Sequence, residues 1–140
     1  MWCSKILVAY DGSIQSQKAL QLAAEIGKED PSIEVVLVHV MKIYANLVAS
    51  GADTALLDEA ENRCNELEDF SSKLANKSHV VLLKGTSPAD LILQCARDEA
   101  CDLIAMGSRG MSGVKGYLGS VSAAVVQGSN IPVLIAKDSD

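Results

Sequence analysis

Glycine recurs at every third position in the stretch MGSRGMSGVKGYLGSVS, which runs from Met106 to Ser122 and holds half of the ten glycines of the chain. The segment follows an apolar run and precedes a helical pattern. Glycine-rich turns at such junctions let phosphate oxygens approach main-chain N–H groups. We therefore interpret the segment as a candidate phosphate-binding turn. Its glycines are Gly107, Gly110, Gly113, Gly116 and Gly119, and the N–H groups that would face the anion are those near Ser120 and Val121.

A plain flexible loop is the alternative role of the glycine segment, and it stays open. A collagen-like repeat is rejected, because it needs many more triplets and abundant proline. The segment lacks the Gly-Lys-Ser/Thr sequence of a Walker loop, and it is not the GxGxxG fingerprint of dinucleotide-binding proteins, which follows the first strand. The spacing alone thus predicts an anion site without naming its ligand.

Asp11, in the sequence DGS after the first apolar run, is the carboxylate that could act beside such a turn. Near phosphates, a carboxylate is useful only through a metal ion or a sugar hydroxyl. Asp and Gly are also ordinary turn residues, so a purely structural role for Asp11 is the alternative.

Several neighbouring side chains could have either a structural or a functional role. Arg109 and Lys115 could neutralise phosphate or be solvated loop cations. Ser122 could bond a phosphate or the preceding helical turn, and Tyr10 could stack on a base or partly block a pocket. His39, within an apolar strand, is interpreted as a histidine of the core or of an interface.

Apolar periodicity predicts the elements that position these residues. Short β-rich apolar runs predict strands, and apolar stripes at spacings of three and four predict helices between them. Ser13 is the expected N-cap of the first helix, and Ser87 with Pro88 opens the third. The predicted strands are Lys5–Tyr10, Ile33–Val40, His79–Lys84, Asp102–Met106 and Ile131–Lys137; the predicted helices are Ile14–Lys28, Ala52–Asn76, one that starts at Pro88 and one from Tyr117 to Gln127; Met41–Gly51 is predicted to be a loop.

Alternating strands and helices predict an α/β fold with parallel pairing and right-handed crossovers. We expect a single domain over residues 1–140, built as a doubly wound five-stranded parallel sheet in the order 3-2-1-4-5 with helices on both faces. In such sheets, ligands bind beyond the carboxyl ends of the strands, where the winding reverses. The first and fourth strands flank that point, so the DGS turn and the glycine segment are expected to meet at one crevice.

Composition narrows the function classes. Of the 140 residues, 49% are hydrophobic but only 4% are aromatic, which suits aliphatic parallel strands covered by helices. The formal net charge of −6 disfavours general binding to nucleic acid or to anionic membranes, which need a basic surface. The four cysteines form no CxxC pair and are interpreted as small buried residues of a cytoplasmic protein. Neither a signal peptide nor a membrane-spanning run is expected.

The sequence resembles the universal stress protein family, and within it the branch that binds ATP. The resemblance spans nearly the whole chain and is carried, in order, by KILVAYDGS, VVLVHV, GTSPADLIL, DLIAMGSRGMSG, LGSVS and IPVLIAK. The ATP-binding branch has the pattern G-x2-G-x9-G-[ST]. Here Gly107-x2-Gly110 is followed by the eight residues 111–118 and then by Gly119-Ser120, so the spacing is one residue short of that pattern.

The resemblance implies an adenine-nucleotide alpha-hydrolase-like fold and a role for individual residues. Asp11 would lie near the ribose and phosphates and could hold Mg²⁺ or Mn²⁺ bound to them. The implied contacts are the main chain of Ala9, Tyr10 and Val40 at the adenine, Met106 and Gly107 at the ribose and base, and Gly110, Gly119, Ser120 and Val121 at the phosphates.

The resemblance also implies a homodimer that pairs through the last strand, Val133–Lys137. An apolar strand at a sheet edge fits this expectation, because a bare edge must be covered or paired. Alternatively, Pro132 and Lys137 protect the edge without a partner.

Three functions stay open at this point. We favour a stress-response regulatory protein that binds ATP, or ADP or AMP. It would hydrolyse ATP slowly at most, since no His or Glu lies beside the glycine segment as a catalytic base. The second is an ATPase or a nucleotidyl-transfer enzyme, and the third is a nucleotide-free dimeric interaction module of the same family.

Overall fold

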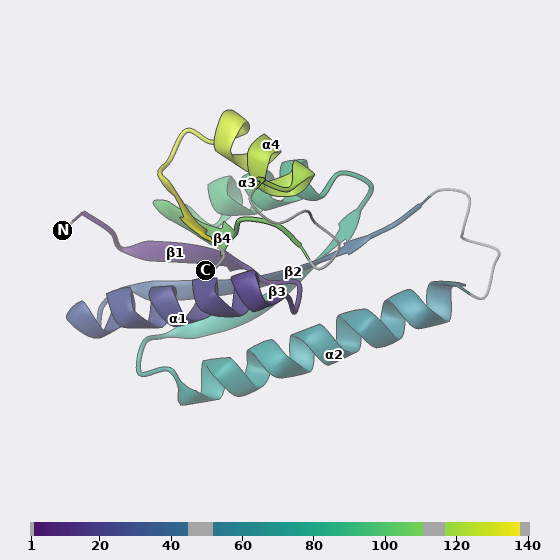
Figure 1. Ribbon diagram of the computed structural model, residues 1–140. Helices are drawn as coiled ribbons and strands as arrows, with labels where there is room; N and C mark the ends of the chain where they lie inside the picture. The colour runs from purple at the N-terminus through teal and green to yellow at the C-terminus, as the bar shows by residue number, and fades with distance from the viewer. Residues whose placement is uncertain (1, 45–51, 111–116, 138–140) are drawn as a thin grey trace.

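The computed structural model describes residues 2–44, 52–110 and 117–137. Within these ranges, strands and helices alternate, and all five strands form one parallel sheet in the order β3-β2-β1-β4-β5 (Figure 1). The predicted α/β fold and strand order are confirmed. The elements are β1 (Lys5–Ala9), α1 (Ile14–Glu29), β2 (Glu34–Lys42), α2 (Ala52–Lys73), β3 (Ser78–Gly85), α3 (Pro88–Asp98), β4 (Leu103–Gly107), α4 (Ser120–Gly128) and β5 (Val133–Ala136).

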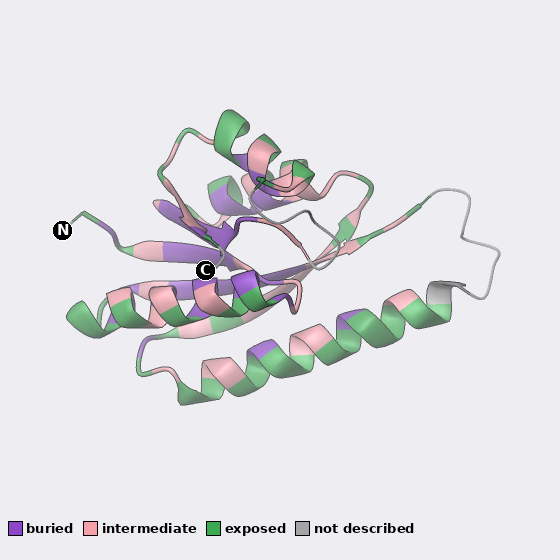
Figure 2. Ribbon diagram, in the orientation of Figure 1, coloured by how far each residue is buried: buried purple, intermediate pink, exposed green. Residues whose placement is uncertain are grey.

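Helices cover both faces of the sheet, with α1 and α2 on one face and α3 and α4 on the other (Figure 1). Consecutive side chains of a strand point to opposite faces. In β1, Ile6 and Val8 therefore join the apolar cluster on the α1–α2 face, whereas Leu7 joins the cluster on the α3–α4 face. Buried residues are concentrated in the strands and on the helix sides turned toward them (Figure 2). The aliphatic side chains thus form two apolar layers, one on each face of the sheet.

The winding of the sheet reverses beside β1. This strand pairs with β2 on one side and with β4 on the other, and Val8 is opposite both Leu37 and Ala105. Because both pairings are parallel, the segments that follow β1 and β4 leave the sheet at the same edge. The DGS turn and the start of the glycine segment therefore lie next to each other, as the strand order predicts.

β2 is longer than predicted. Met41 and Lys42, expected in a loop, pair with Lys84 and Gly85 of β3. Strand pairing continues here because β3 runs parallel over the same length, which the periodicity of β2 alone does not reveal. The remainder of the predicted loop includes residues 45–51, which lie outside the described residues.

α2 is shorter than predicted and ends at Lys73. The reason lies at Asn76, whose side-chain amide donates to the carbonyl oxygens of Gly27, Asp30 and Ile33 at 3.0, 3.1 and 3.0 Å. Asn76 thus leaves the helix to join the α2–β3 turn to the α1–β2 turn.

α4 begins at Ser120, so the predicted start at Tyr117 is wrong. Gly119 is its N-cap, in an extended conformation, and Tyr117 and Leu118 precede the helix with exposed side chains. Apolar periodicity continues backward from the helix, but the helical backbone does not. The other predicted boundaries agree to within two residues.

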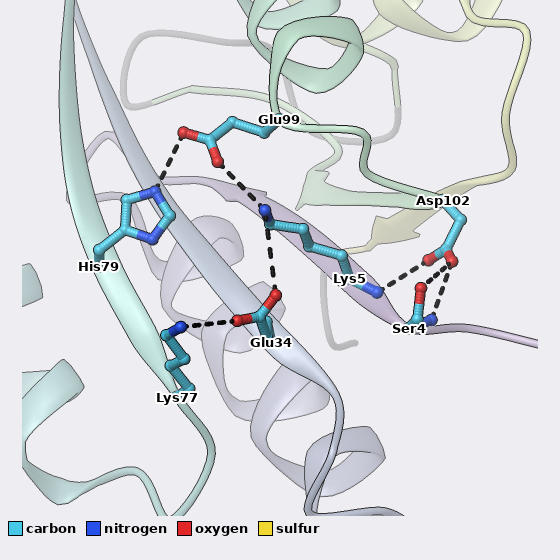
Figure 3. Close-up of polar contacts among 7 residues, drawn as sticks. All are labelled: Ser4, Lys5, Glu34, Lys77, His79, Glu99 and Asp102. Atoms are coloured by element: carbon cyan, nitrogen blue, oxygen red, sulfur yellow. Dashed lines mark hydrogen bonds and ion pairs between the residues drawn. The ribbon is translucent and has the colours of Figure 1, made fainter.

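At the amino end of the sheet, polar contacts tie β1 to its neighbours (Figure 3). Lys5 Nζ lies 3.3 Å from Glu99 and 4.0 Å from Glu34. Asp102 accepts hydrogen bonds from the main-chain N–H and hydroxyl of Ser4, both at 2.8 Å, and from the N–H of Lys5 at 3.1 Å. Lys77 and His79 extend the network through Glu34 and Glu99.

The cysteines are free, and Cys3, Cys95 and Cys101 are buried while Cys64 is partly buried. Burial raises the pKa of the Cys3 and Cys101 thiols to about 12 and that of Cys95 to about 11, so these three stay protonated. They pack as small apolar residues, as predicted. Across the described ranges, no helix combines the length and the apolar character needed to cross a membrane.

Candidate functional site

A cavity of about 300 Å³ lies at the carboxyl end of the sheet, where the winding reverses. Its lining comes from the ends of β1, β2 and β4, from α3 and from the start of α4. All ten residues that the family resemblance implies as nucleotide contacts contribute to it, although they come from three distant parts of the chain. They are Ala9, Tyr10, Asp11, Val40, Met106, Gly107, Gly110, Gly119, Ser120 and Val121.

Asp11 uses its two carboxylate oxygens differently. Oδ1 accepts a hydrogen bond from the main-chain N–H of Ser13 at 3.0 Å, which is the geometry of an Asx turn. Oδ2 is turned toward Gly110 in the cavity wall, since a β-carbon added to that glycine would lie 2.7 Å from it. The structural and the functional interpretation of Asp11 are therefore compatible, because one oxygen shapes the turn while the other faces the cavity.

The two ends of the glycine segment are joined directly. The carbonyl oxygen of Ser108 accepts hydrogen bonds from the N–H of Gly119 at 2.8 Å and from the hydroxyl of Ser122 at 2.7 Å. These contacts bring Gly110 and Gly119 to the same cavity despite the eight-residue spacing. Residues 111–116, with Gly113, Lys115 and Gly116, lie outside the described residues.

Ser122 is buried, with 2% of its surface exposed. Its single hydroxyl proton is directed at the carbonyl oxygens of Ser108 and Gly119. A phosphate oxygen needs a donor, and this donor is already engaged. Of the two roles considered for Ser122, the structure supports bonding within the protein.

The N-terminus of α4 offers main-chain donors to the cavity. Its N-cap, Gly119, has no side chain that could accept hydrogen bonds from the first turn, whereas α1 is capped by the hydroxyl of Ser13, which accepts from the N–H of Ser16 at 3.1 Å. The first N–H groups of a helix have no partner within the helix, and the helix dipole favours an anion beside them. Ser120 and Val121 occupy this first turn and also line the cavity.

An apolar wall stands on the other side of the cavity. Val38 and Val40 of β2 point to the same face as Ala9 of β1, toward α3. Pro88 and Ile92, one turn apart on α3, complete the wall. No role in the site was predicted from the sequence for Val38, Pro88, Ile92 or Ser16, which also line the cavity. The four-residue spacing of Pro88 and Ile92 could have indicated that the first turn of α3 faces the same crevice.

Tyr10 neither stacks in the cavity nor blocks it, because its side chain belongs to the apolar cluster on the α1–α2 face. Its hydroxyl donates to Glu66 Oε1 at 2.7 Å. Burial, together with this bond to Glu66, raises the pKa of Tyr10 to about 12. The carbonyl oxygen of Tyr10 accepts from Nδ1 of His39 at 2.9 Å, and His39 is 5% exposed, so the prediction of a core histidine is confirmed.

Charged groups around the cavity are few. Asp11 and Arg109 are the charged residues among the described lining, and Arg109 already has an electrostatic or hydrogen-bonding contact within the protein. No cluster of three or more His, Cys, Asp or Glu side chains that could hold a metal ion occurs among the described residues. A cation at this site would therefore have to share Asp11 with a ligand that brings oxygens of its own.

The strand order of the doubly wound sheet and its likeness to solved structures together show an α/β protein of the adenine-nucleotide alpha-hydrolase-like type. Two of the solved structures that align with the chain illustrate this likeness. The protein MJ0577 of Methanocaldococcus jannaschii aligns with a TM-score of 0.82 and 29% identity, covering 100% of this chain and 99% of that one. A universal stress protein from Archaeoglobus fulgidus in complex with dAMP aligns with a TM-score of 0.74 and 25% identity, covering 98% of this chain and 100% of that one.

Sequence comparison places the chain within one family. Residues 3–137 match the Universal stress protein family. The universal stress protein YxiE of Bacillus subtilis is 36% identical over 150 residues, which cover 96% of this chain and 99% of the relative. The chain belongs to the universal stress protein family.

Proposed function

We propose that this protein is a stress-response regulator that binds ATP in the cavity at the carboxyl end of its sheet. The observation that carries the proposal is that the N-terminus of α4, the carboxylate of Asp11 and an apolar wall converge on one cavity. A nucleotide has matching parts, namely anionic phosphates, hydroxylated ribose and a flat apolar base. We also propose that it acts in the cytoplasm as a single domain spanning residues 1–140.

The apolar wall suits the adenine. Main-chain atoms of Ala9, Tyr10 and Val40 would border the base, and main-chain N–H and C=O groups can read the edge of a base without charged side chains. Met106 and Gly107 would line the ribose and the near side of the base. Support also comes from the Archaeoglobus fulgidus relative, whose complex contains dAMP.

The phosphates would lie against Gly110, Gly119, Ser120 and Val121. Main-chain N–H groups at a helix N-terminus bind phosphate without a basic surface, which reconciles an anionic ligand with an acidic protein. The exposed hydroxyl of Ser120 supplies a further donor. ADP and AMP carry the same base and sugar, so the preference among the three depends on this end of the cavity.

Asp11 would hold a Mg²⁺ or Mn²⁺ ion together with the phosphates. These cations prefer oxygen ligands and commonly bind through one or two carboxylates plus phosphate oxygens and waters. The donor set fits, because Asp11 lines the cavity and its Oδ2 faces Gly110 in the cavity wall, while Oδ1 is engaged in the turn. When bound, the ion would offset the repulsion between the carboxylate and the phosphates.

ATP would be held without fast turnover. The described lining of the cavity contains neither His nor Glu, and Asp11 is its single carboxylate. A carboxylate that binds the metal ion is poorly placed to accept a proton from water as well. We expect turnover far below about 1 s⁻¹, the lower end for typical enzymes.

We further propose a homodimer formed through Val133–Lys137. β5 is an edge strand of the sheet and pairs with β4 on one side. The other side presents main-chain donors and acceptors that a second β5 can satisfy by antiparallel pairing.

Calorimetric titration tests the nucleotide proposal. The titrants are ATP with Mg²⁺, ATP with a chelator, ADP, AMP and adenosine, after mass spectrometry of any ligand released from the purified protein. The variant is Asp11→Asn, because an amide oxygen can still accept from Ser13 N–H and preserve the turn while the charge is removed. Glu61→Gln, on the exposed side of α2, is the matched control.

We expect wild type and Glu61→Gln to bind ATP more tightly with Mg²⁺ than without it. Asp11→Asn should lose most of that gain and keep its affinity for adenosine. Tighter binding of AMP than of ATP would overturn ATP as the ligand. If the wild-type protein contains no nucleotide and gives no heat with any titrant, the function is instead that of a nucleotide-free dimeric module.

A further inference from the structure

Both chain neighbours of Asp11 are held by helix α2, on the face of the sheet opposite the cavity. Tyr10 precedes Asp11, and its hydroxyl donates to Glu66 Oε1 at 2.7 Å. Gly12 follows Asp11 and lies beneath the guanidinium of Arg63. Two side chains of α2 therefore hold the turn on either side of the carboxylate.

Gly12 shows how closely α2 approaches this turn. Its φ of +88° is in the left-handed region that favours glycine. A β-carbon at Gly12 would collide with Arg63 Nη1 and lie 3.0 Å from Arg63 Cδ. The Arg63 side chain is only 17% exposed, so Arg63 packs on the turn instead of extending into solvent.

Glu66 joins the two contacts into one unit. Its Oε1 accepts from Tyr10 and lies 3.0 Å from Arg63 Nε. The Arg63–Glu66 contact is an ion pair without an aligned hydrogen bond. Glu59 adds a longer contact to Arg63 Nη1 at 3.8 Å. We call Tyr10, Arg63 and Glu66 the α2 clamp.

The α2 clamp can act on the cavity only through the main chain. Arg63 and Glu66 do not belong to the described lining of the cavity. The Tyr10 ring is in the α1–α2 cluster, and its carbonyl oxygen is held by His39. What the clamp determines is therefore the path of residues 10–12, and with it the direction of the Asp11 carboxylate.

We propose that Arg63 and Glu66 are positioning residues for the nucleotide site: together with Tyr10 they fix the turn so that Asp11 Oδ2 faces the metal ion and the phosphates. This inference rests on the proposed function and assigns to α2 a role in it. Because coupling is reciprocal, binding of Mg²⁺ and ATP also steadies α2. Adenosine, which has neither phosphate nor metal ion, does not engage this coupling.

A double-mutant cycle between the clamp and Asp11 tests the inference. The variants are Tyr10→Phe, which removes one hydroxyl, and Arg63→Met, which keeps an unbranched chain over Gly12 without its charge. Each is made alone and in the Asp11→Asn background, with Glu61→Gln as the α2 control. Affinities for ATP with Mg²⁺ and for adenosine are measured by calorimetry, and amide exchange in α2 is measured with and without ATP and Mg²⁺.

We expect each clamp variant to weaken binding of ATP with Mg²⁺ by about threefold to tenfold, in the range of contacting pairs in such cycles. Adenosine affinity should change by less than about twofold, and no further loss should occur in the Asp11→Asn background. ATP with Mg²⁺ should slow amide exchange in α2 of wild type and Glu61→Gln, but less in Arg63→Met.

Three results would overturn the inference: unchanged affinity for ATP with Mg²⁺, an equal loss for ATP and adenosine, or full additivity with Asp11→Asn. If a clamp variant loses affinity for ATP and for adenosine equally and also has a lower melting temperature, the clamp only stabilises the fold. Wild type that binds no nucleotide refutes the proposed function itself, and this inference with it. That result is read from wild type alone, so the two failures are distinguishable.

Discussion

The carboxylate of Asp11 faces Gly110, and a β-carbon added to Gly110 would lie 2.7 Å from Asp11 Oδ2. These residues are far apart in the sequence and belong to the segments that follow β1 and β4. Their contact joins the two halves of the doubly wound sheet at the cavity. It also explains why the first part of the glycine segment needs a residue without a side chain.

Gly110→Ala should displace the Asp11 carboxylate without unfolding the protein. The clash involves only the tip of the Asp11 side chain, which can rotate away, so the free energy of unfolding should change by less than about 1 kcal/mol. The affinity for ATP with Mg²⁺ should fall by about tenfold, while adenosine binding is retained. Calorimetry and urea unfolding measure the two quantities.

Gly128→Ala, at the far end of α4, is the matched control for Gly110→Ala. Its added methyl group meets only the tip of Leu93, so nucleotide affinity should stay at the wild-type value. Equal loss of affinity in both variants would contradict the specific role of the Asp11–Gly110 contact.

Ser122→Ala should lower the free energy of unfolding by about 1 kcal/mol, the typical contribution of one hydrogen bond. Its hydroxyl donates to the buried carbonyl oxygen of Ser108, which keeps only the N–H of Gly119 in the variant. Urea unfolding is the measurement, and Ser120→Ala is the control for stability because Ser120 is exposed. A Ser122→Ala protein as stable as Ser120→Ala would mean that the Ser108 contact does not hold the two ends of the segment together.

The lowered pKa of Asp102 predicts that the protein loses stability in acid. Burial alone would raise the pKa of this carboxyl, but hydrogen bonds from Ser4, Lys5 and Cys3 outweigh burial and lower it from 3.8 to about 2. A carboxyl whose pKa is lower in the folded than in the unfolded protein stabilises the fold at pH values above the pKa of the unfolded state. This stability is therefore present above about pH 4 and is lost as the pH falls toward 2.

The contribution of Asp102 at neutral pH is on the order of 1 kcal/mol, because Asp102 is partly exposed and solvent screening reduces the free energy equivalent of the pKa shift. Asp102→Asn should reduce stability by about that amount at pH 7 and by much less at pH 2.5. Urea unfolding at both pH values measures the difference, with the exposed Asp98→Asn as the control. If the free energies of unfolding of wild type and Asp102→Asn differ by the same amount at both pH values, the lowered pKa of Asp102 does not stabilise the fold.

The proposed dimer predicts that backbone amides at the β5 edge of the sheet are protected from hydrogen exchange, and that this protection increases with protein concentration. Amides of β5 that point away from β4 should exchange more slowly at high protein concentration, because a second β5 then covers them. β3, the opposite edge strand, is the internal control and should exchange at the same rate throughout. Sedimentation at the mass of one 14.8 kDa chain at all concentrations would refute the dimer.

Much of the fold was predictable because its determinants are local. The run KILVA predicts a buried strand from composition alone, Ser13 predicts the start of α1 through its capping hydroxyl, and Pro88 predicts the start of α3. The strand order is predicted by the general rules for parallel crossovers, together with the family resemblance. The convergence of Asp11 with Gly110 and Gly119 then follows from the shared carboxyl edge of β1 and β4.

Composition, periodicity and motif order were therefore enough to predict the α/β class, the family and ten of the residues that line the cavity. The three-dimensional structure was needed to show which carboxylate oxygen of Asp11 faces Gly110, on which face the Tyr10 ring lies, and that Arg63 packs on Gly12. Periodicity records how a residue relates to its neighbours along one element. These contacts depend instead on the register between strands and on the approach of α2 to a turn about fifty residues earlier in the chain. Hydrophobic periodicity does not predict such long-range contacts, because it describes only the spacing of residues within one element.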